Sequence, residues 1–83
     1  MSEENLEPDR KLDVTGLNCP LPILRTKREL VRMAAGERLH VSATDPHSVV
    51  DFLSFTGKTH HRMLRHWEED GVFLFLIEKG NDR

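Results

Sequence analysis

The feature that most constrains the fold is an unbroken run of six apolar residues near the C-terminus, from Val72 to Ile77. Successive side chains of a strand point to opposite faces of a sheet, so a strand without a polar position needs cover on both faces. The run therefore predicts a central strand. Either its even-numbered or its odd-numbered residues must face away from any helices that pack on the sheet.

The side chains that face away from the helices leave two alternatives open. An uncovered apolar face on a small protein often marks a partner surface, which would make the chain a scaffold that docks through its sheet. Alternatively, Trp67 and long polar side chains cover this face. The sequence does not decide between the two.

Hydrophobic periodicity and turn residues divide the rest of the chain into further elements. They predict a strand at residues 12–15, a helix at 20–35 closed by Gly36, a strand at 39–44, a helix that starts at Asp45-Pro46 and ends at Gly57, and a strand at 60–67 before the hairpin turn Glu69-Asp70-Gly71.

This order, βαβαββ, predicts an α/β fold. In so short a chain two helices cannot cover both faces of a four-stranded sheet. We therefore predict a two-layer sandwich, with a mixed four-stranded sheet and both helices on one face. The ordered domain is expected at residues 10–80. Residues 1–9 are expected to form a flexible acidic tail, and residues 81–83 a flexible C-terminus.

Composition excludes several classes of protein. The chain has 83 residues and a net charge of −2, so it is not an obvious nucleic-acid binder. No apolar run is long enough to span a bilayer, and the acidic N-terminus shows no secretory signal. The single cysteine, Cys19, allows no internal disulfide and no multi-thiolate zinc site. We expect a cytoplasmic protein in a reducing compartment.

The most informative stretch is Cys19-Pro20-Leu21-Pro22, which places the lone thiol directly before a predicted helix. A helix N-terminus favours an anion, so the position predicts a lowered pKa for the Cys19 thiol. Proline lacks an N–H, which the first helical turn tolerates, and two prolines stiffen the loop. The alternative is a small, buried, unreactive cysteine.

Other thiol and histidine chemistry is less well supported. The chain has no second cysteine to resolve a mixed disulfide, so an independent thiol–disulfide oxidoreductase is not expected. None of the five histidines stands at a diagnostic spacing from Cys19 for a Cys–His hydrolase. His60 and His66 lie too far apart on a strand to share an ion, and His61 points to the other face. We predict no metal site.

The segment Gly16-Leu17-Asn18-Cys19-Pro20-Leu21-Pro22 resembles the Gly-Leu-x-Cys-Pro-x-Pro signature of the TusA/SirA family of small sulfur carriers. The resemblance extends over residues 10–80. At the variable position this chain has Leu21, whereas tRNA-thiolation members have Glu. Further matches are Leu12-Asp13-Val14-Thr15-Gly16, Gly36-Glu37, Thr44-Asp45-Pro46 and Glu78-Lys79-Gly80.

The resemblance implies a two-layer α/β sandwich in which Cys19 accepts sulfane sulfur as a persulfide. Gly16, Pro20 and Pro22 would shape the loop. The partners it implies are a cysteine desulfurase or another sulfur donor, and a downstream acceptor protein. The sulfur would serve tRNA thiolation, molybdenum-cofactor or sulfur metabolism. The protein would be a sulfurtransferase component without independent turnover, with no cofactor and no membrane partner.

Arg25, Arg28 and Arg32 recur at helical spacing on one polar face. They are candidates for steering an acidic partner or an anion toward the thiol, and the alternative is an ordinary solvated helix face. A second functional hypothesis is an RNA-binding or regulatory protein-interaction module without sulfur chemistry, because the predicted fold resembles small RNA-binding α/β modules.

Overall fold

The computed structural model describes residues 7–81, so the start of the predicted acidic tail (1–6) and residues 82–83 lie outside the described part. The element order is βαβαββ, as the sequence predicts. The elements are β1 (Arg10–Val14), α1 (Leu21–Val31), β2 (Arg38–Ala43), α2 (Ser48–Lys58), β3 (Arg62–Glu69) and β4 (Val72–Glu78).

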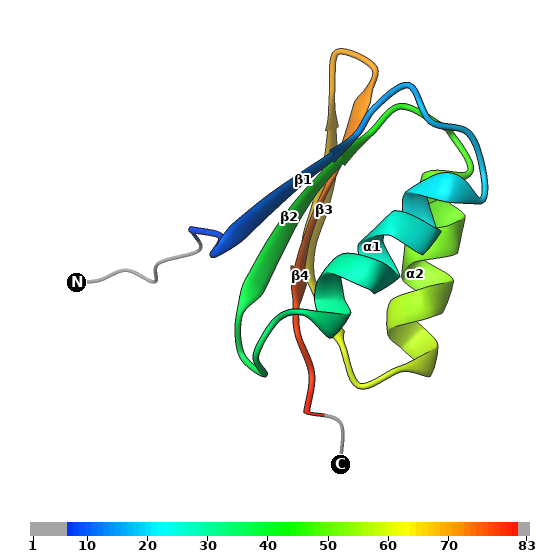
Figure 1. Ribbon diagram of the computed structural model, residues 1–83. Helices are drawn as coiled ribbons and strands as arrows, with labels where there is room; N and C mark the ends of the chain where they lie inside the picture. Colours follow the sequence, from blue (N-terminus) through cyan, green and yellow to red (C-terminus); the bar gives the residue numbers. More distant parts are fainter. Residues whose placement is uncertain (1–6, 82–83) are drawn as a thin grey trace.

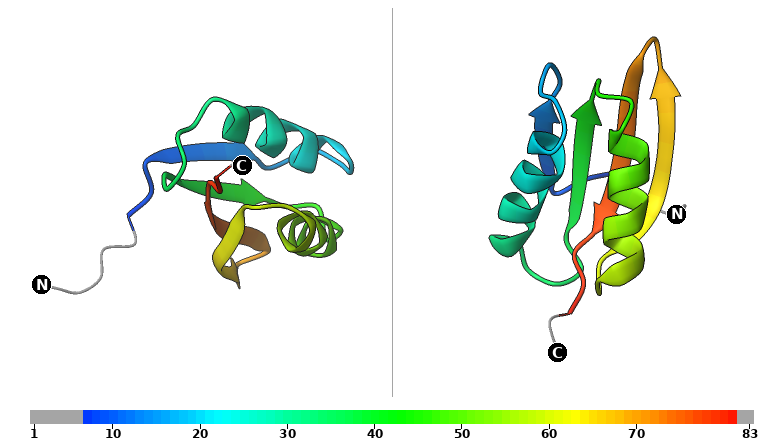
Figure 2. Two further views of the ribbon diagram at one scale, coloured as in Figure 1. Left: turned by 90° about the horizontal axis from the view of Figure 1, so that it is seen from below. Right: turned by 90° about the vertical axis from the view of Figure 1, so that its right-hand side faces the viewer.

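The four strands form one mixed sheet in the order β1-β2-β4-β3, and both helices pack on the same face (Figure 1). β1 runs parallel to β2, and β4 runs antiparallel to both β2 and β3. Figure 2 shows α1 over β1 and β2, and α2 over β4 and β3. The predicted two-layer sandwich is confirmed, with the apolar run of residues 72–77 as the central strand β4.

The core fills the space between the helices and the sheet. Phe52 of α2 stacks on Phe75 of β4 with the ring centroids 4.3 Å apart, and both rings are fully buried. Such an aromatic pair stabilises a fold by about 0.5–1.5 kcal/mol beyond the area it buries. The odd-numbered residues of β4 therefore face the helices. The surrounding buried aliphatic side chains are Val14, Leu30, Leu39, Val41 and Ile77.

The even-numbered residues of β4 face away from the helices, and two of them are nevertheless buried, Leu74 at 9% and Leu76 at 3% exposure. Trp67 of β3 lies opposite Leu74, and its indole meets the His40 ring edge-on at 5.9 Å. The Arg65 guanidinium lies 4.7 Å from the Trp67 ring centroid. Of the two predicted alternatives, the second is therefore correct: Trp67 and long polar side chains cover this face of the sheet, which is not an open apolar surface.

Helix α1 ends at Val31, earlier than the predicted boundary before Gly36. The carbonyl of Leu30 accepts a hydrogen bond of 2.6 Å from the buried ammonium of Lys79. The Ala34 N–H, which would bond that carbonyl in a continuing helix, donates instead to a glutamate side chain. Gly36, with a φ of 92°, is thus a turn residue before β2 and not the helix cap.

The second helix, in contrast, starts and ends slightly later than predicted. Asp45 precedes it, and one carboxylate oxygen of Asp45 accepts the His47 N–H at 3.1 Å. The helix itself begins at Ser48 and continues through Gly57 to Lys58. Asp45 therefore accepts a backbone hydrogen bond within the turn that leads into α2, and it does not directly precede the first residue of the helix.

Strand β3 lies two residues further along than the predicted 60–67. Its pairing with β4 is shifted between Met63 and Arg65, which leaves Leu64 as the extra residue of a bulge. The bulge is the physical reason for the broken apolar alternation in this part of the sequence. Beyond it, Arg65 and Trp67 share the face of the sheet that lacks helices.

We expect Lys79→Met to lower the free energy of unfolding by about 1–3 kcal/mol, because the Leu30 carbonyl loses its hydrogen bond from a buried ammonium and keeps only backbone donors such as the Met33 N–H. Urea denaturation followed by circular dichroism measures the change. The control is Lys58→Met, which removes an exposed lysine from the last turn of α2 and should change stability by less than about 0.5 kcal/mol. Equal effects of the two substitutions would contradict this role for Lys79.

Candidate functional site

The predicted Cys19 loop joins β1 to α1 and lies at the carboxyl ends of the parallel strands β1 and β2. Gly16 has a φ of 83°, a conformation that favours glycine. Its N–H donates to the Thr44 hydroxyl at 2.8 Å, while the Leu17 N–H returns to the Val14 carbonyl at 3.2 Å. The loop is therefore fixed to the end of β2 before it reaches the cysteine.

Asp45 fixes the cysteine itself. One carboxylate oxygen of Asp45 accepts the backbone N–H of Cys19, and the other accepts the N–H of His47. The hydrogen bond from the His47 N–H lowers the pKa of the Asp45 carboxyl most, and the hydrogen bond from the Cys19 N–H lowers it further. A single ionised side chain thus connects the β1–α1 loop to the turn before α2.

The Cys19 side chain is exposed, so the alternative of a buried cysteine is wrong. Its thiol donates a hydrogen bond to a carboxylate oxygen of Asp51, with Sγ 3.4 Å from Oδ2. That hydrogen bond, with the charges of Asp51 and Asp45, raises the pKa of the Cys19 thiol. The predicted lowering is therefore wrong: the position before α1 is correct, but the carboxylates of Asp51 and Asp45 oppose ionisation of the thiol.

Cys19 stands at a groove of about 400 Å³ between α1 and α2. Ile23 and Phe55 give the groove apolar walls. Lys27 also lines it, with its ammonium 5.5 Å from the centroid of the Phe55 ring. The groove can receive an extended chain segment whose reactive atom reaches the thiol. The remaining lining residues are Pro20, Asp51, Ser54, Lys58 and Thr59.

The structure separates the predicted residues into two places. Pro20 lines the groove, and Pro22 is buried in the first turn of α1. Arg25, Arg28 and Arg32 do not line the groove; they line a second hollow beside β1. The basic side chains next to the thiol groove are instead lysines.

Sequence reasoning missed Asp51, the residue with the largest effect on the thiol. It lies far from Cys19 in the chain and has the ordinary sequence context of an acidic residue in a first helical turn. One signal could have pointed to it. The parallel pairing of β1 and β2 brings the two loops that follow them together, so the start of α2 must lie near Cys19.

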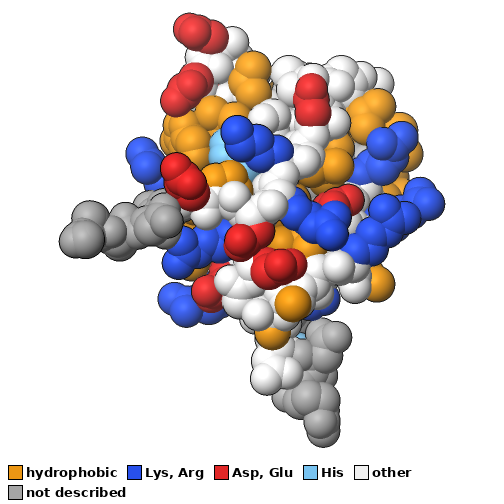
Figure 3. Space-filling view, turned by 60° about the vertical axis from the view of Figure 1, so that its left-hand side comes forward, with side chains coloured by type: hydrophobic (Ala, Val, Ile, Leu, Met, Phe, Trp, Pro, Cys, Tyr) orange, Lys and Arg blue, Asp and Glu red, His pale blue; other side chains and the backbone are white. Residues whose placement is uncertain are grey.

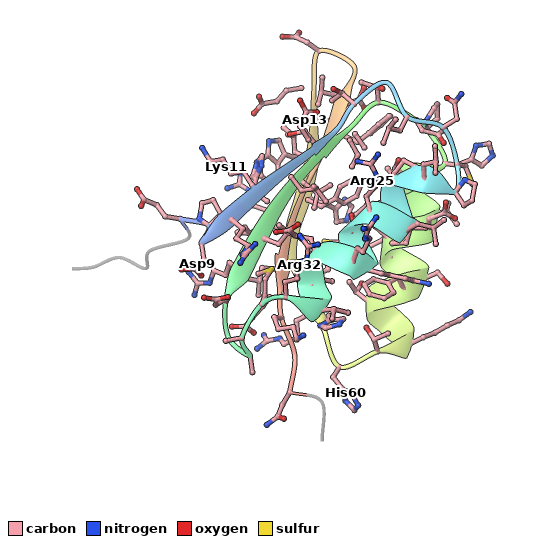
Figure 4. The ribbon with its side chains drawn as sticks, viewed as in Figure 1. Asp9, Lys11, Asp13, Arg25, Arg32 and His60 are labelled. Carbon is pink, nitrogen blue, oxygen red and sulfur yellow. The ribbon has the colours of Figure 1, made fainter. Side chains whose placement is uncertain are left out.

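The histidines considered above as metal ligands, His60, His61 and His66, lie apart from the Cys19 site. His60 follows α2 and projects at the end of the molecule away from the β1–α1 loop (Figure 4). The His61 Nδ1 accepts the Gly80 N–H at 2.9 Å, and the His66 ring stacks on Phe75 at 6.4 Å. Within residues 7–81, no group of three or more His, Cys, Asp and Glu side chains is arranged to hold a metal ion.

Comparison with known proteins shows the family of this chain. The family model described as sulfurtransferase TusA matches residues 10–79. The sulfur carrier protein TusA of Allochromatium vinosum is 54% identical over 71 residues, covering 86% of this chain and 93% of the relative. A putative sulfur carrier protein of Neisseria meningitidis is 49% identical over 67 residues, covering 81% of this chain and 90% of the relative. The chain belongs to the TusA family.

A solved structure shares the fold. The SirA-like protein of Desulfitobacterium hafniense matches with a TM-score of 0.76 at 24% sequence identity, covering 87% of this chain and 99% of that one. In residues 7–81, no helix has the length and apolar character needed to cross a membrane.

We expect Asp51→Asn to shift the reactivity of Cys19 to lower pH. The substitution removes the carboxylate whose hydrogen bond and negative charge raise the thiol pKa, so a larger fraction of Cys19 is thiolate at neutral pH. The rate of alkylation by iodoacetamide, followed by intact-mass spectrometry across the pH range, measures this shift.

Asp70→Asn is the matched control, because Asp70 is an exposed carboxylate in the β3–β4 turn and asparagine tolerates its positive φ of 51°. Its alkylation profile should coincide with that of the unsubstituted protein. A profile that Asp51→Asn leaves unchanged would show that this carboxylate does not control the thiol.

Proposed function

We propose that this protein is a sulfur carrier that holds sulfane sulfur as a persulfide on Cys19 and passes it to an acceptor protein. The observation that supports this most directly is the exposed lone thiol, fixed by its backbone to Asp45 at the mouth of an open groove. Membership of the TusA family, whose named relatives include sulfur carriers, points to the same chemistry.

Loading is a thiol exchange in which no net oxidation occurs. The Cys19 thiolate attacks the outer sulfur of a donor persulfide, the sulfane sulfur. A sulfur–sulfur bond forms at Cys19 while the sulfur–sulfur bond of the donor breaks. The donor cysteine leaves as a thiolate and takes up a proton. A cysteine desulfurase or another persulfide-bearing protein can act as this donor.

Unloading repeats the exchange in the opposite sense. An acceptor thiolate attacks the outer sulfur of the Cys19 persulfide, and Cys19 leaves as a thiolate. A leaving thiol with a higher pKa leaves more slowly. Asp51 raises the Cys19 pKa and therefore slows unloading as long as its carboxylate remains beside the sulfur. Contact with a partner that moves or pairs Asp51 would accelerate it.

The groove between the helices suits a partner segment that brings a cysteine to Cys19. Ile23 and Phe55 can bury apolar side chains of that segment, and Lys27 can pair with its carboxylates. The carrier needs no second cysteine, because each partner supplies its own thiol. It also needs no cofactor, since its cargo is bound covalently. It acts as a protein co-substrate, without independent turnover.

Intact-mass spectrometry tests the carrier function. The reduced protein is incubated with a cysteine desulfurase and cysteine, and separately with polysulfide. We expect a gain of one sulfur atom that a reductant removes, because only the thiol can accept sulfane sulfur. The isosteric control Cys19→Ser should gain nothing under either condition.

Two results would separate the parts of this proposal. Loading by polysulfide but not by the desulfurase would reject that donor and retain the carrier chemistry. No loading under either condition, with the thiol shown to be free by alkylation, would reject sulfur carriage. In that case RNA binding by Cys19→Ala in a filter assay would favour the interaction-module hypothesis.

A further inference from the structure

A second hollow lies on the other side of α1, between this helix and the edge strand β1. Its volume is about 190 Å³, and we call it the arginine pocket; its lining residues are Leu12, Arg25, Arg28, Glu29 and Arg32. Figure 4 shows Arg25 and Arg32 on the part of α1 that lies toward β1. None of the five lining residues belongs to the Cys19 groove.

The arginine pocket has an uncompensated positive charge. Its one carboxylate, that of Glu29, is paired with the Arg10 guanidinium at the start of β1. Within residues 7–81, Arg25, Arg28 and Arg32 form no ion pair and no side-chain hydrogen bond. Figure 3 shows Lys and Arg side chains on both sides of one face of the molecule, with Asp and Glu side chains between them. Three unpaired guanidinium groups around one hollow fit a ligand with several carboxylates or other anionic oxygens.

The strand beside the arginine pocket has a free edge. β1 is an outer strand of the sheet, and in residues 7–81 it pairs with β2 alone. Its backbone groups on the outer edge are therefore available to an added strand. Leu12, half-buried at this edge, offers an apolar contact between the backbone and the arginines.

We infer that the arginine pocket and the free edge of β1 together bind an extended acidic segment of a partner protein. The segment adds to β1 as a fifth strand and directs alternate Asp or Glu side chains into the pocket. That the partner is a sulfur donor or acceptor rests on the proposed function. The binding chemistry is independent of Cys19.

The spacing of the two elements supports this arrangement. From Arg25 to Arg32 the helix rises about 10.5 Å, at about 1.5 Å per residue. Residues i, i+2 and i+4 of a strand lie on one face and span about 13 Å. Three alternate carboxylates can therefore reach the three arginines within the flexibility of their side chains.

An acidic strand fits this surface better than a second copy of the chain or an RNA strand. Two copies paired through β1 would bring two arginine pockets together, and like charges at such short range repel. Single-stranded RNA is usually held by aromatic side chains on which its bases stack, and the arginine pocket has none. The free backbone edge and Leu12 also have no function toward a phosphate chain.

Fluorescence anisotropy with a labelled peptide of alternating glutamate and valine tests the charge recognition. Arg25→Gln with Arg32→Gln should weaken peptide binding by about ten-fold or more. The matched control is Arg62→Gln with Arg65→Gln, which removes the same charge from β3 at the opposite edge of the sheet and should change binding by less than about two-fold. Cys19→Ser should bind like the unsubstituted protein, so loss of sulfur chemistry is distinguishable from loss of this site.

Backbone methylation of the same peptide tests strand addition. An added strand presents every second N–H to β1, so N-methyl groups on one alternate set of amides should abolish binding and those on the other set should not. Equal weakening by the pocket substitutions and by the β3 control substitutions, or insensitivity to both methylation patterns, would overturn the proposal. Tighter binding of a single-stranded RNA that displaces the peptide would also overturn it.

Discussion

The candidate site depends on one ionised side chain, the carboxylate of Asp45. It accepts the N–H of Cys19 and the N–H of His47, and thus joins the loop after β1 to the turn before α2. Each of these backbone groups would otherwise have to be satisfied by water, and only the hydrogen bond from Gly16 to Thr44, three residues before the cysteine, would still hold the loop to the end of β2. With the connection in place, the thiol is presented on a fixed backbone, and Asp51 in the first turn of α2 lies within hydrogen-bond distance of its sulfur.

The separation of the two basic surfaces follows from the position of α1 over the edge of the sheet. One side of the helix faces α2 and contributes Lys27 to the groove beside the thiol. The other side faces the edge strand β1 and contributes the arginine pocket. A partner could therefore occupy the groove and the strand edge at the same time. Binding at the edge would hold a partner near Cys19 without contact to the sulfur.

The sequence was sufficient for the order of elements, the two layers and the position of the thiol, because these follow from periodicity, chain length and local motifs. It was insufficient where a contact between distant residues decides the outcome. Lys79 bonds the Leu30 carbonyl at the end of α1, and no local feature of either segment shows this contact. The pKa of Cys19 was predicted with the wrong sign for the same reason, since Asp51 lies in another helix.

The cover over β4 has a consequence for the behaviour of the protein in a crowded solution. Leu74 and Leu76 are shielded by side chains that end in charged or polar groups, with Arg65 lying over the Trp67 ring. A single sheet with one bare apolar face would adhere to similar sheets. Here, the guanidinium of Arg65 and the imidazole of His40 lie between the aliphatic side chains and the solvent. The molecule can therefore present its thiol to successive partners while its broadest face remains resistant to nonspecific adhesion.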